Sequence, residues 1–186
     1  MIRSFIAIMI PEKIREEIGE ILKEYQEKRY PCRWVAPENL HITLVFLGEV
    51  SEKFLAEVKR ELAKTTQQTK EFLIKLGGFG AFPSTKNPRV FWIGVPLGTK
   101  EIEELQRVIV ESLAKIGFKP EERRFHPHLT LGRTKDFIKD IDLFERKYES
   151  EVIKVNSITL FKSTLTPEGP IYEKIEEYPL LKRPDT

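Results

Sequence analysis

Two of the three histidines in this chain occur in the same four-residue frame. Residues 41–44 are His-Ile-Thr-Leu, and residues 128–131 are His-Leu-Thr-Leu. Apolar residues flank both copies, which predicts two short, buried strands. Because side chains at positions i and i+2 leave the same face of a strand, each copy places an imidazole beside a hydroxyl group.

This combination suits acid–base chemistry on an anion. The ordinary imidazole pKa of about 6.5 allows one histidine to be neutral and another protonated near neutral pH. His41 and His128 could therefore act as general base and general acid across one reacting centre. The hydroxyl groups of Thr43 and Thr130 would then donate hydrogen bonds to oxygens that gain charge in the transition state. We predict phosphoryl transfer at a diester, with the two histidines as catalytic residues and the two threonines as substrate-binding residues.

Arg133 is the candidate cation of this site, but strict strand alternation points it away. Alternation places His128, Thr130 and Gly132 on one face and Arg133 on the other. Arg133 reaches the site only if the strand bends or ends near Gly132, where a bulge would be easy. The same alternation predicts two faces for the first motif strand: His41, Thr43, Val45 and Leu47 on one, and Ile42, Leu44 and Phe46 on the other.

Two other interpretations compete with catalysis. A single His-x-Thr on a strand is more often structural, but two copies that use two of three histidines favour function. His41, His126 and His128 could instead bind a metal. However, neither motif has a carboxylate close by in the sequence, and Cys32 is isolated, whereas zinc sites show recognisable ligand spacing. We therefore predict no metal and no cofactor, and we leave His126 out of the site.

The elements that must position these residues follow from hydrophobic periodicity. Helices are expected from Pro11 to about residue 28, after an N-cap at Ser51, over 99–116 and, as a shorter piece, over 138–147. Strands are expected over 2–10, 33–35, 40–47 (ended by Gly48), 72–76, 89–95, 127–133, 151–163 and 171–176. Bulge and turn residues fill 77–80 and 83–88. Each half contains one His-x-Thr strand, which indicates weak internal symmetry. We expect residues 1–186 to form a single two-lobed α+β domain.

Composition sets limits on localisation and partners. The chain has 186 residues, is 40% hydrophobic and 32% charged, and carries a net charge of +2. This near balance predicts no general attraction to nucleic acid, so any RNA contact should be local. The N-terminal apolar run is too short to span a bilayer, and one cysteine suits a reducing compartment. A cytoplasmic protein without membrane association is expected.

Further residues could contribute to RNA binding. One set of basic side chains could form a local phosphate-attracting rim: Arg123, Arg124, Arg133 and Lys135. One set of aromatic side chains could stack on bases, although strand aromatics are more often core residues: Trp34, Trp92, Phe125 and Phe161. The glycines of residues 77–80 lack the Lys-Ser/Thr of a P-loop and predict turn chemistry instead.

The chain resembles the two-histidine (2H) phosphoesterases, and within them the archaeal and bacterial RNA 2',3'-cyclic phosphodiesterases, also called 2'-5' RNA ligases. The resemblance runs nearly from end to end. It rests on residues 3–7, 34–35, 38–44, 46–48, 88–95, 125–133, 160–165 and 169–172, which include both His-x-Thr motifs.

The resemblance implies a fold, a reaction and a partner. The fold would have two lobes related by a pseudo-twofold axis, each an antiparallel sheet with helices on its outer face. The cleft between the lobes would hold His41, Thr43, His128 and Thr130. The reaction would be hydrolysis of RNA 2',3'-cyclic phosphate ends to 2'-phosphates, with 2'-5' ligation as its reverse. Either histidine could be the base.

The expected partners are RNA 3' ends, with tRNA halves as one possible substrate, and the protein is expected to be a monomer. The alternative function is a module that binds RNA ends or nucleotides without turnover.

Overall fold

The computed structural model describes residues 1–184, which form three α-helices, two short 3-10 helices and nine strands. The helices are α1 (Glu12–Glu27), α2 (Glu52–Thr66) and α3 (Thr99–Ala114), with 3-10 turns at Pro37–Asn39 and Asp142–Glu145. The strands are β1 (Ile2–Met9), β2 (Arg33–Trp34), β3 (His41–Val50), β4 (Phe72–Ser84), β5 (Asn87–Leu97), β6 (Leu129–Arg133), β7 (Ile153–Val155), β8 (Ser157–Thr166) and β9 (Gly169–Pro179).

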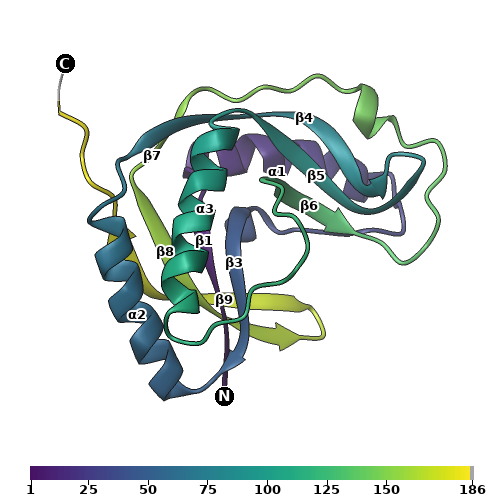
Figure 1. Ribbon diagram of the computed structural model, residues 1–186. Helices are drawn as coiled ribbons and strands as arrows, with labels where there is room; N and C mark the ends of the chain where they lie inside the picture. Colours follow the sequence, from purple (N-terminus) through teal and green to yellow (C-terminus); the bar gives the residue numbers. More distant parts are fainter. Residues whose placement is uncertain (185–186) are drawn as a thin grey trace.

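The strands form two antiparallel sheets, which are the two lobes of the molecule (Figure 1). The four-stranded sheet has the order β3-β1-β8-β9, and the five-stranded sheet has the order β2-β6-β5-β4-β7. The lobes are not the two halves of the sequence, because the C-terminal strands β8 and β9 join the N-terminal β1, whereas β2 pairs with β6. One His-x-Thr segment nevertheless belongs to each sheet: the first lies in β3, and the second begins at His128, one residue before β6.

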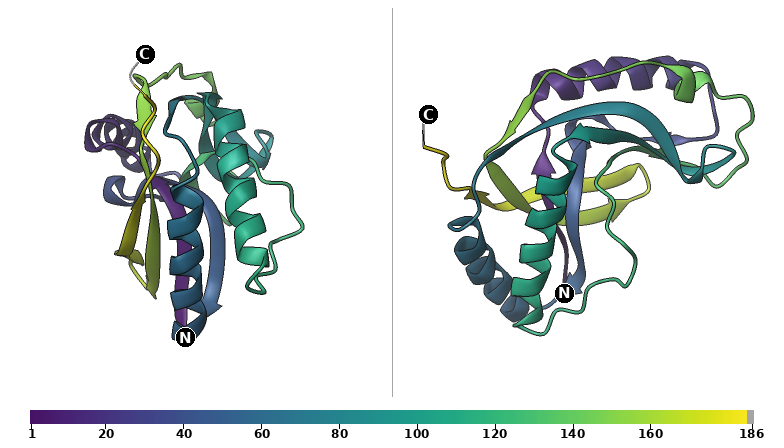
Figure 2. Two further views of the ribbon diagram at one scale, coloured as in Figure 1. Left: turned by 60° about the vertical axis from the view of Figure 1, so that its left-hand side comes forward. Right: turned by 45° about the horizontal axis from the view of Figure 1, so that its top comes forward.

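Helices cover the outer faces of both sheets, as the resemblance implied (Figure 2). Helices α2 and α3 lie side by side and contact the four-stranded sheet at β9 and β3. Helix α1 lies apart from them and packs on the five-stranded sheet through Tyr25, whose ring centroid is 5.8 Å from that of Trp34. Trp34 in turn lies 5.3 Å from Phe91 of β5. The inner faces of the sheets are therefore left for the site.

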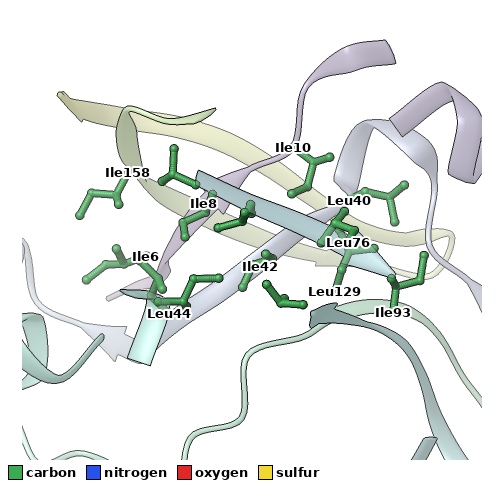
Figure 3. Close-up of a cluster of buried hydrophobic side chains, with 14 of the residues drawn as sticks. Ile6, Ile8, Ile10, Leu40, Ile42, Leu44, Leu76, Ile93, Leu129 and Ile158 are labelled. Carbon is green, nitrogen blue, oxygen red and sulfur yellow. The ribbon is translucent and has the colours of Figure 1, made fainter. Parts of the chain in front are cut away.

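One hydrophobic core joins the two lobes (Figure 3). It contains side chains of the four-stranded sheet, such as Ile6 and Leu44, together with side chains of the five-stranded sheet, such as Leu76 and Ile93. Ile42 and Leu129, the residues between histidine and threonine in the two motifs, are both fully buried, at 0% exposure. Burial of these two side chains fixes the opposite face of each motif, so that each histidine and threonine points away from the core.

Most predicted elements are present. The stretch 151–163, predicted as strand, is divided between β7 and β8, because β7 pairs with β4 of one sheet and β8 with β1 of the other. The other differences have local causes. The Ser51 hydroxyl caps α2 by accepting a hydrogen bond from the backbone N–H of Phe54 at 3.1 Å, as predicted. Gly48 does not end β3, because its positive φ of 73° is accommodated at a register shift and the strand continues to Val50. Residues 77–80 do not form a turn; they form the predicted bulges, at register shifts within the long strand β4. The predicted helical piece over 138–147 is only the 3-10 turn Asp142–Glu145.

Candidate active site

Each of the two motif histidines makes the same kind of hydrogen bond, from its ring to a backbone carbonyl two residues earlier. The Nδ1 atom of His41 lies 2.6 Å from the carbonyl oxygen of Asn39, and Nδ1 of His128 lies 2.6 Å from the carbonyl oxygen of His126. Because a carbonyl oxygen can only accept, Nδ1 must be the donor in both rings. The Nε2 atom of each ring is therefore left to accept or donate a proton at the site.

The threonine of the first motif is directly connected to its histidine. The His41 Nε2 atom lies 3.0 Å from the Thr43 hydroxyl group, as expected for side chains two positions apart on one face of a strand. Thr43 and Thr130 both line the space between the lobes. Each motif thus presents an imidazole and a hydroxyl group to the same region.

A β-bulge falls at the fourth residue of each motif. In β3, Thr43 is opposite Ala7 and Val45 is opposite Ile6, so the register omits Leu44. In β6, Thr130 is opposite Trp92 of β5 and Gly132 is opposite Phe91, so the register omits Leu131. Because a bulge inserts one residue into a strand, it reverses the alternation of every side chain beyond it.

The bulge in β6 resolves the position of Arg133. Beyond Leu131 the alternation is reversed, so Arg133 lies on the side of Thr130 and lines the cleft between the lobes. The bulge in β3 overturns the predicted faces of the first strand. Val45 and Leu47 are buried, at 6% and 8% exposure, while Phe46 is 38% exposed and lines the cleft.

The cleft consists of two adjoining cavities of about 810 and 690 Å³. His41 lines the first and His128 lines the second. Both volumes are in the range of sites for small ligands. Five residues line both cavities and mark where they meet: Arg3, Thr43, Phe46, Thr130 and Arg133. The two imidazoles therefore lie in the two cavities that meet at this junction, one in each.

The surroundings of both histidines favour the neutral imidazole. Burial lowers the pKa of His41 below its ordinary value, an effect that the Asn39 carbonyl opposes and the nearby His128 reinforces. Burial likewise lowers the pKa of His128; the His126 carbonyl opposes this, whereas the charges of Arg133 and Arg123 add to it. An anionic substrate would act in the opposite direction, because a negative charge favours protonated imidazole.

These shifts predict the pH dependence of the reaction. If the two imidazoles act as general acid and general base, one must be protonated and the other neutral, so kcat/KM should follow a bell-shaped curve set by the macroscopic pKa values of the pair. Since both values are lowered, kcat/KM should be highest below about pH 6.5 and should fall as the pH rises through neutrality, where both rings are neutral. The kcat profile should lie at higher pH, because bound phosphate stabilises the charged ring. A kcat/KM that still increases above pH 7 would contradict this assignment.

Aromatic rings surround both histidines, and sequence reasoning missed most of them. Phe5 and Tyr172 lie 4.9 and 5.3 Å from the His41 ring, and Phe82 lies 5.0 Å from the His128 ring. None of the three was a stacking candidate. Phe5 and Tyr172 fall within segments of the family resemblance, which was the one available signal. Nothing local in the sequence identifies such rings, because pairing between strands places them beside the histidines.

The predicted stacking and basic residues are only partly at the cleft. Of the aromatic candidates, Trp34 lines the first cavity and Phe125 the second, whereas Phe161 is 7% exposed and packs 5.2 Å from Phe5, and Trp92 packs over Gly80. Of the basic candidates, Arg123, Arg124 and Arg133 line the second cavity. Lys135 lines neither cavity, and its carbonyl oxygen accepts a hydrogen bond from Arg89.

Two features of residues 1–184 bear on the other interpretations. No group of three or more His, Cys, Asp or Glu side chains in this range could hold a metal ion, so the three histidines do not form such a group with one another. Within the same range, no helix is long and apolar enough to cross a membrane.

Two antiparallel lobes, each presenting one His-x-Thr segment to a shared cleft, define a two-histidine phosphoesterase. More specifically, the chain belongs to the family described as LigT like Phosphoesterase. The family model matches residues 8–92 and again residues 93–172. Each matched segment contains one of the two motifs, consistent with the internal symmetry indicated by the sequence.

Relatives and solved structures agree with this assignment. Proteins named RNA 2',3'-cyclic phosphodiesterase from Archaeoglobus fulgidus and Methanocaldococcus jannaschii are each 42% identical to this chain, and the matches cover 95% of this chain and 99% of each relative. The crystal structure of TT0787 of Thermus thermophilus matches with a TM-score of 0.82 and 26% identity, over 96% of this chain and 97% of that one. E. coli LigT complexed with 3'-AMP matches with a TM-score of 0.76 and 27% identity, over 96% and 98%.

Proposed function

We propose that this protein hydrolyses the 2',3'-cyclic phosphate ends of RNA to 2'-phosphates by acid–base catalysis that needs no metal. The observation that carries the proposal is the matched pair of imidazoles, each held through Nδ1 by a backbone carbonyl and each lining a different arm of one cleft. The names of the relatives supply the substrate class, since these proteins are called RNA 2',3'-cyclic phosphodiesterases.

The proposed reaction is a displacement at phosphorus across the cleft junction. The neutral imidazole, either His41 or His128, takes a proton from water as the water oxygen forms a bond to phosphorus. The protonated imidazole gives its proton to the 3' oxygen as the bond between phosphorus and that oxygen breaks. The phosphate remains on the 2' oxygen. Thr43, Thr130 and Arg133 would bind the oxygens that gain charge in the transition state.

The same groups would form a 2'-5' linkage with a different nucleophile. If the 5'-hydroxyl group of a second RNA replaces water, proton transfer and displacement are otherwise unchanged, and the product is a 2'-5' phosphodiester. Two cavities that meet at the reacting centre would accommodate the groups on either side of this bond. The two halves of a cleaved tRNA are one pair of ends that such a reaction could join.

The test is product identification in the presence of EDTA. An RNA oligonucleotide with a 2',3'-cyclic phosphate end should lose the cyclic end and yield a 2'-phosphate, identified against synthetic 2'- and 3'-phosphate standards. A 3'-phosphate product would disprove the proposed direction of ring opening. Saturable binding of the oligonucleotide with the cyclic end retained would instead indicate a module that binds RNA ends without turnover.

A further inference from the structure

Arg3 lies at the junction of the two cavities, although neither motif contains it. It is on β1, next to β3, and its guanidinium carbon lies 4.5 Å from the centre of the Phe46 ring. Cation–π contact of this kind orients an arginine without using its hydrogen-bond donors. Arg3 lines both cavities together with Thr43, Thr130 and Arg133.

The donors of Arg3 have no protein partner. The Nε atom is buried and makes no hydrogen bond, and no side-chain hydrogen bond or salt bridge found within residues 1–184 involves Arg3. Glu49, its cross-strand neighbour in the β1–β3 register, is exposed and forms no ion pair with it. With no acceptor on the protein, the terminal N–H groups of Arg3 remain free to donate to a ligand in the cleft.

Arg3 is placed differently from Arg133 relative to the reacting centre. Arg133 is the fifth residue after His128, and the fifth residue after His41 is Phe46. Phe5 of β1 is opposite Phe46 of β3, and Arg3 is two residues before Phe5 on β1. The Arg3 side chain extends over the Phe46 ring to reach the junction. Arg3 and Arg133 thus come to the junction from different sheets, so they can contact different phosphates of one bound RNA.

We propose that Arg3 binds the phosphodiester adjacent to the terminal cyclic phosphate and thereby makes the enzyme prefer oligonucleotides to nucleoside 2',3'-cyclic monophosphates. The inference rests on the proposed function, because it assumes a cyclic phosphate at the cleft junction. Arginine is suited to the role, since its planar fork donates two parallel hydrogen bonds to a phosphate.

The experiment compares two substrates that differ only in the adjacent phosphodiester. One is a nucleoside 2',3'-cyclic monophosphate, and the other is a dinucleotide that ends in the same cyclic nucleotide. Arg3→Gln should lower kcat/KM for the dinucleotide by about ten- to a hundredfold, mainly through KM, as expected for loss of hydrogen bonds to a charged group. Turnover of the mononucleotide should change by less than about threefold. The slope of log Kd against log salt for an uncleavable oligonucleotide should fall by about 0.7, corresponding to one phosphate contact.

Two further variants make the result decisive. Arg107→Gln removes the same charge from the exposed surface of α3, where Arg107 pairs with Glu104 and Glu111, and should leave both substrates unaffected. Arg3→Lys keeps the positive charge but not the paired guanidinium donors, so its kcat/KM should fall less than that of Arg3→Gln, and again only for the dinucleotide. Arg3→Lys serves as the test if Arg3→Gln does not fold. If the Arg3 variants lost kcat/KM equally on both substrates, or lost none on either, the inference would be overturned. Failure of the proposed function would differ, because the unsubstituted protein would then produce no 2'-phosphate from either substrate.

Discussion

Replacing either His41 or His128 by alanine should reduce kcat by about two to four orders of magnitude, the contribution expected of one general acid or base. Each ring lines its own arm of the cleft, so the remaining histidine cannot take over both proton transfers. Folding should be little affected, because the core contacts of the motifs are made by the neighbouring residues Ile42 and Leu129. Single-turnover rates on a cyclic-phosphate oligonucleotide, together with thermal unfolding, provide the measurement.

The double variant and His126→Ala serve as controls for this prediction. Groups that act as one catalytic unit are not additive, so the double variant should be only slightly slower than the slower single variant. His126 acts on His128 through its backbone carbonyl, which His126→Ala retains, so that variant should stay within about tenfold of the unsubstituted protein. Near-normal turnover in either catalytic variant would mean that the two histidines are not the acid–base pair.

The parts of the fold that follow from local patterns could be predicted from the sequence. Apolar spacing located the three helices, and the Ser51 cap and both motif strands followed from residues close together in the chain. The membership of the two sheets could not be found in this way. Pairing of β8 with β1 and of β2 with β6 joins segments more than 90 residues apart, and no local signal specifies such partners.

The same reason limits what the sequence reveals about the site. His41, Thr43, His128 and Thr130 were found because their spacing matches a strand, and the structure brings all four to one cleft. Phe46 was placed on the wrong face, because a bulge depends on the register with a partner strand and not on the strand alone. Arg3 was not expected at the cleft because it reaches the cleft from a strand without a motif, across the ring of Phe46.

Replacing Arg133 by glutamine should lower kcat/KM by about two to three orders of magnitude, comparable with the loss of one oxyanion-stabilising donor in other enzymes. The bulge at Leu131 turns this side chain toward the junction of the two cavities, where the reacting phosphate would lie. Charge on the phosphate oxygens increases in the transition state, so the loss should appear in kcat as well as in KM. Arg133→Lys should recover part of the activity, because it restores the charge but not the two-pronged donor geometry.

Arg33 provides a matched control for this prediction. It pairs with Arg133 in the β2–β6 register and lines the first cavity, but its guanidinium group donates to the Pro167 carbonyl oxygen at 3.4 Å. Arg33→Gln therefore removes one positive charge from the same region without removing a donor from the reacting centre. Its kcat/KM should fall by less than about tenfold. If the two variants lost activity equally, Arg133 would act only through the general positive potential of the cleft. A much larger loss in Arg133→Gln would show that the bulge places one particular guanidinium group against the phosphate.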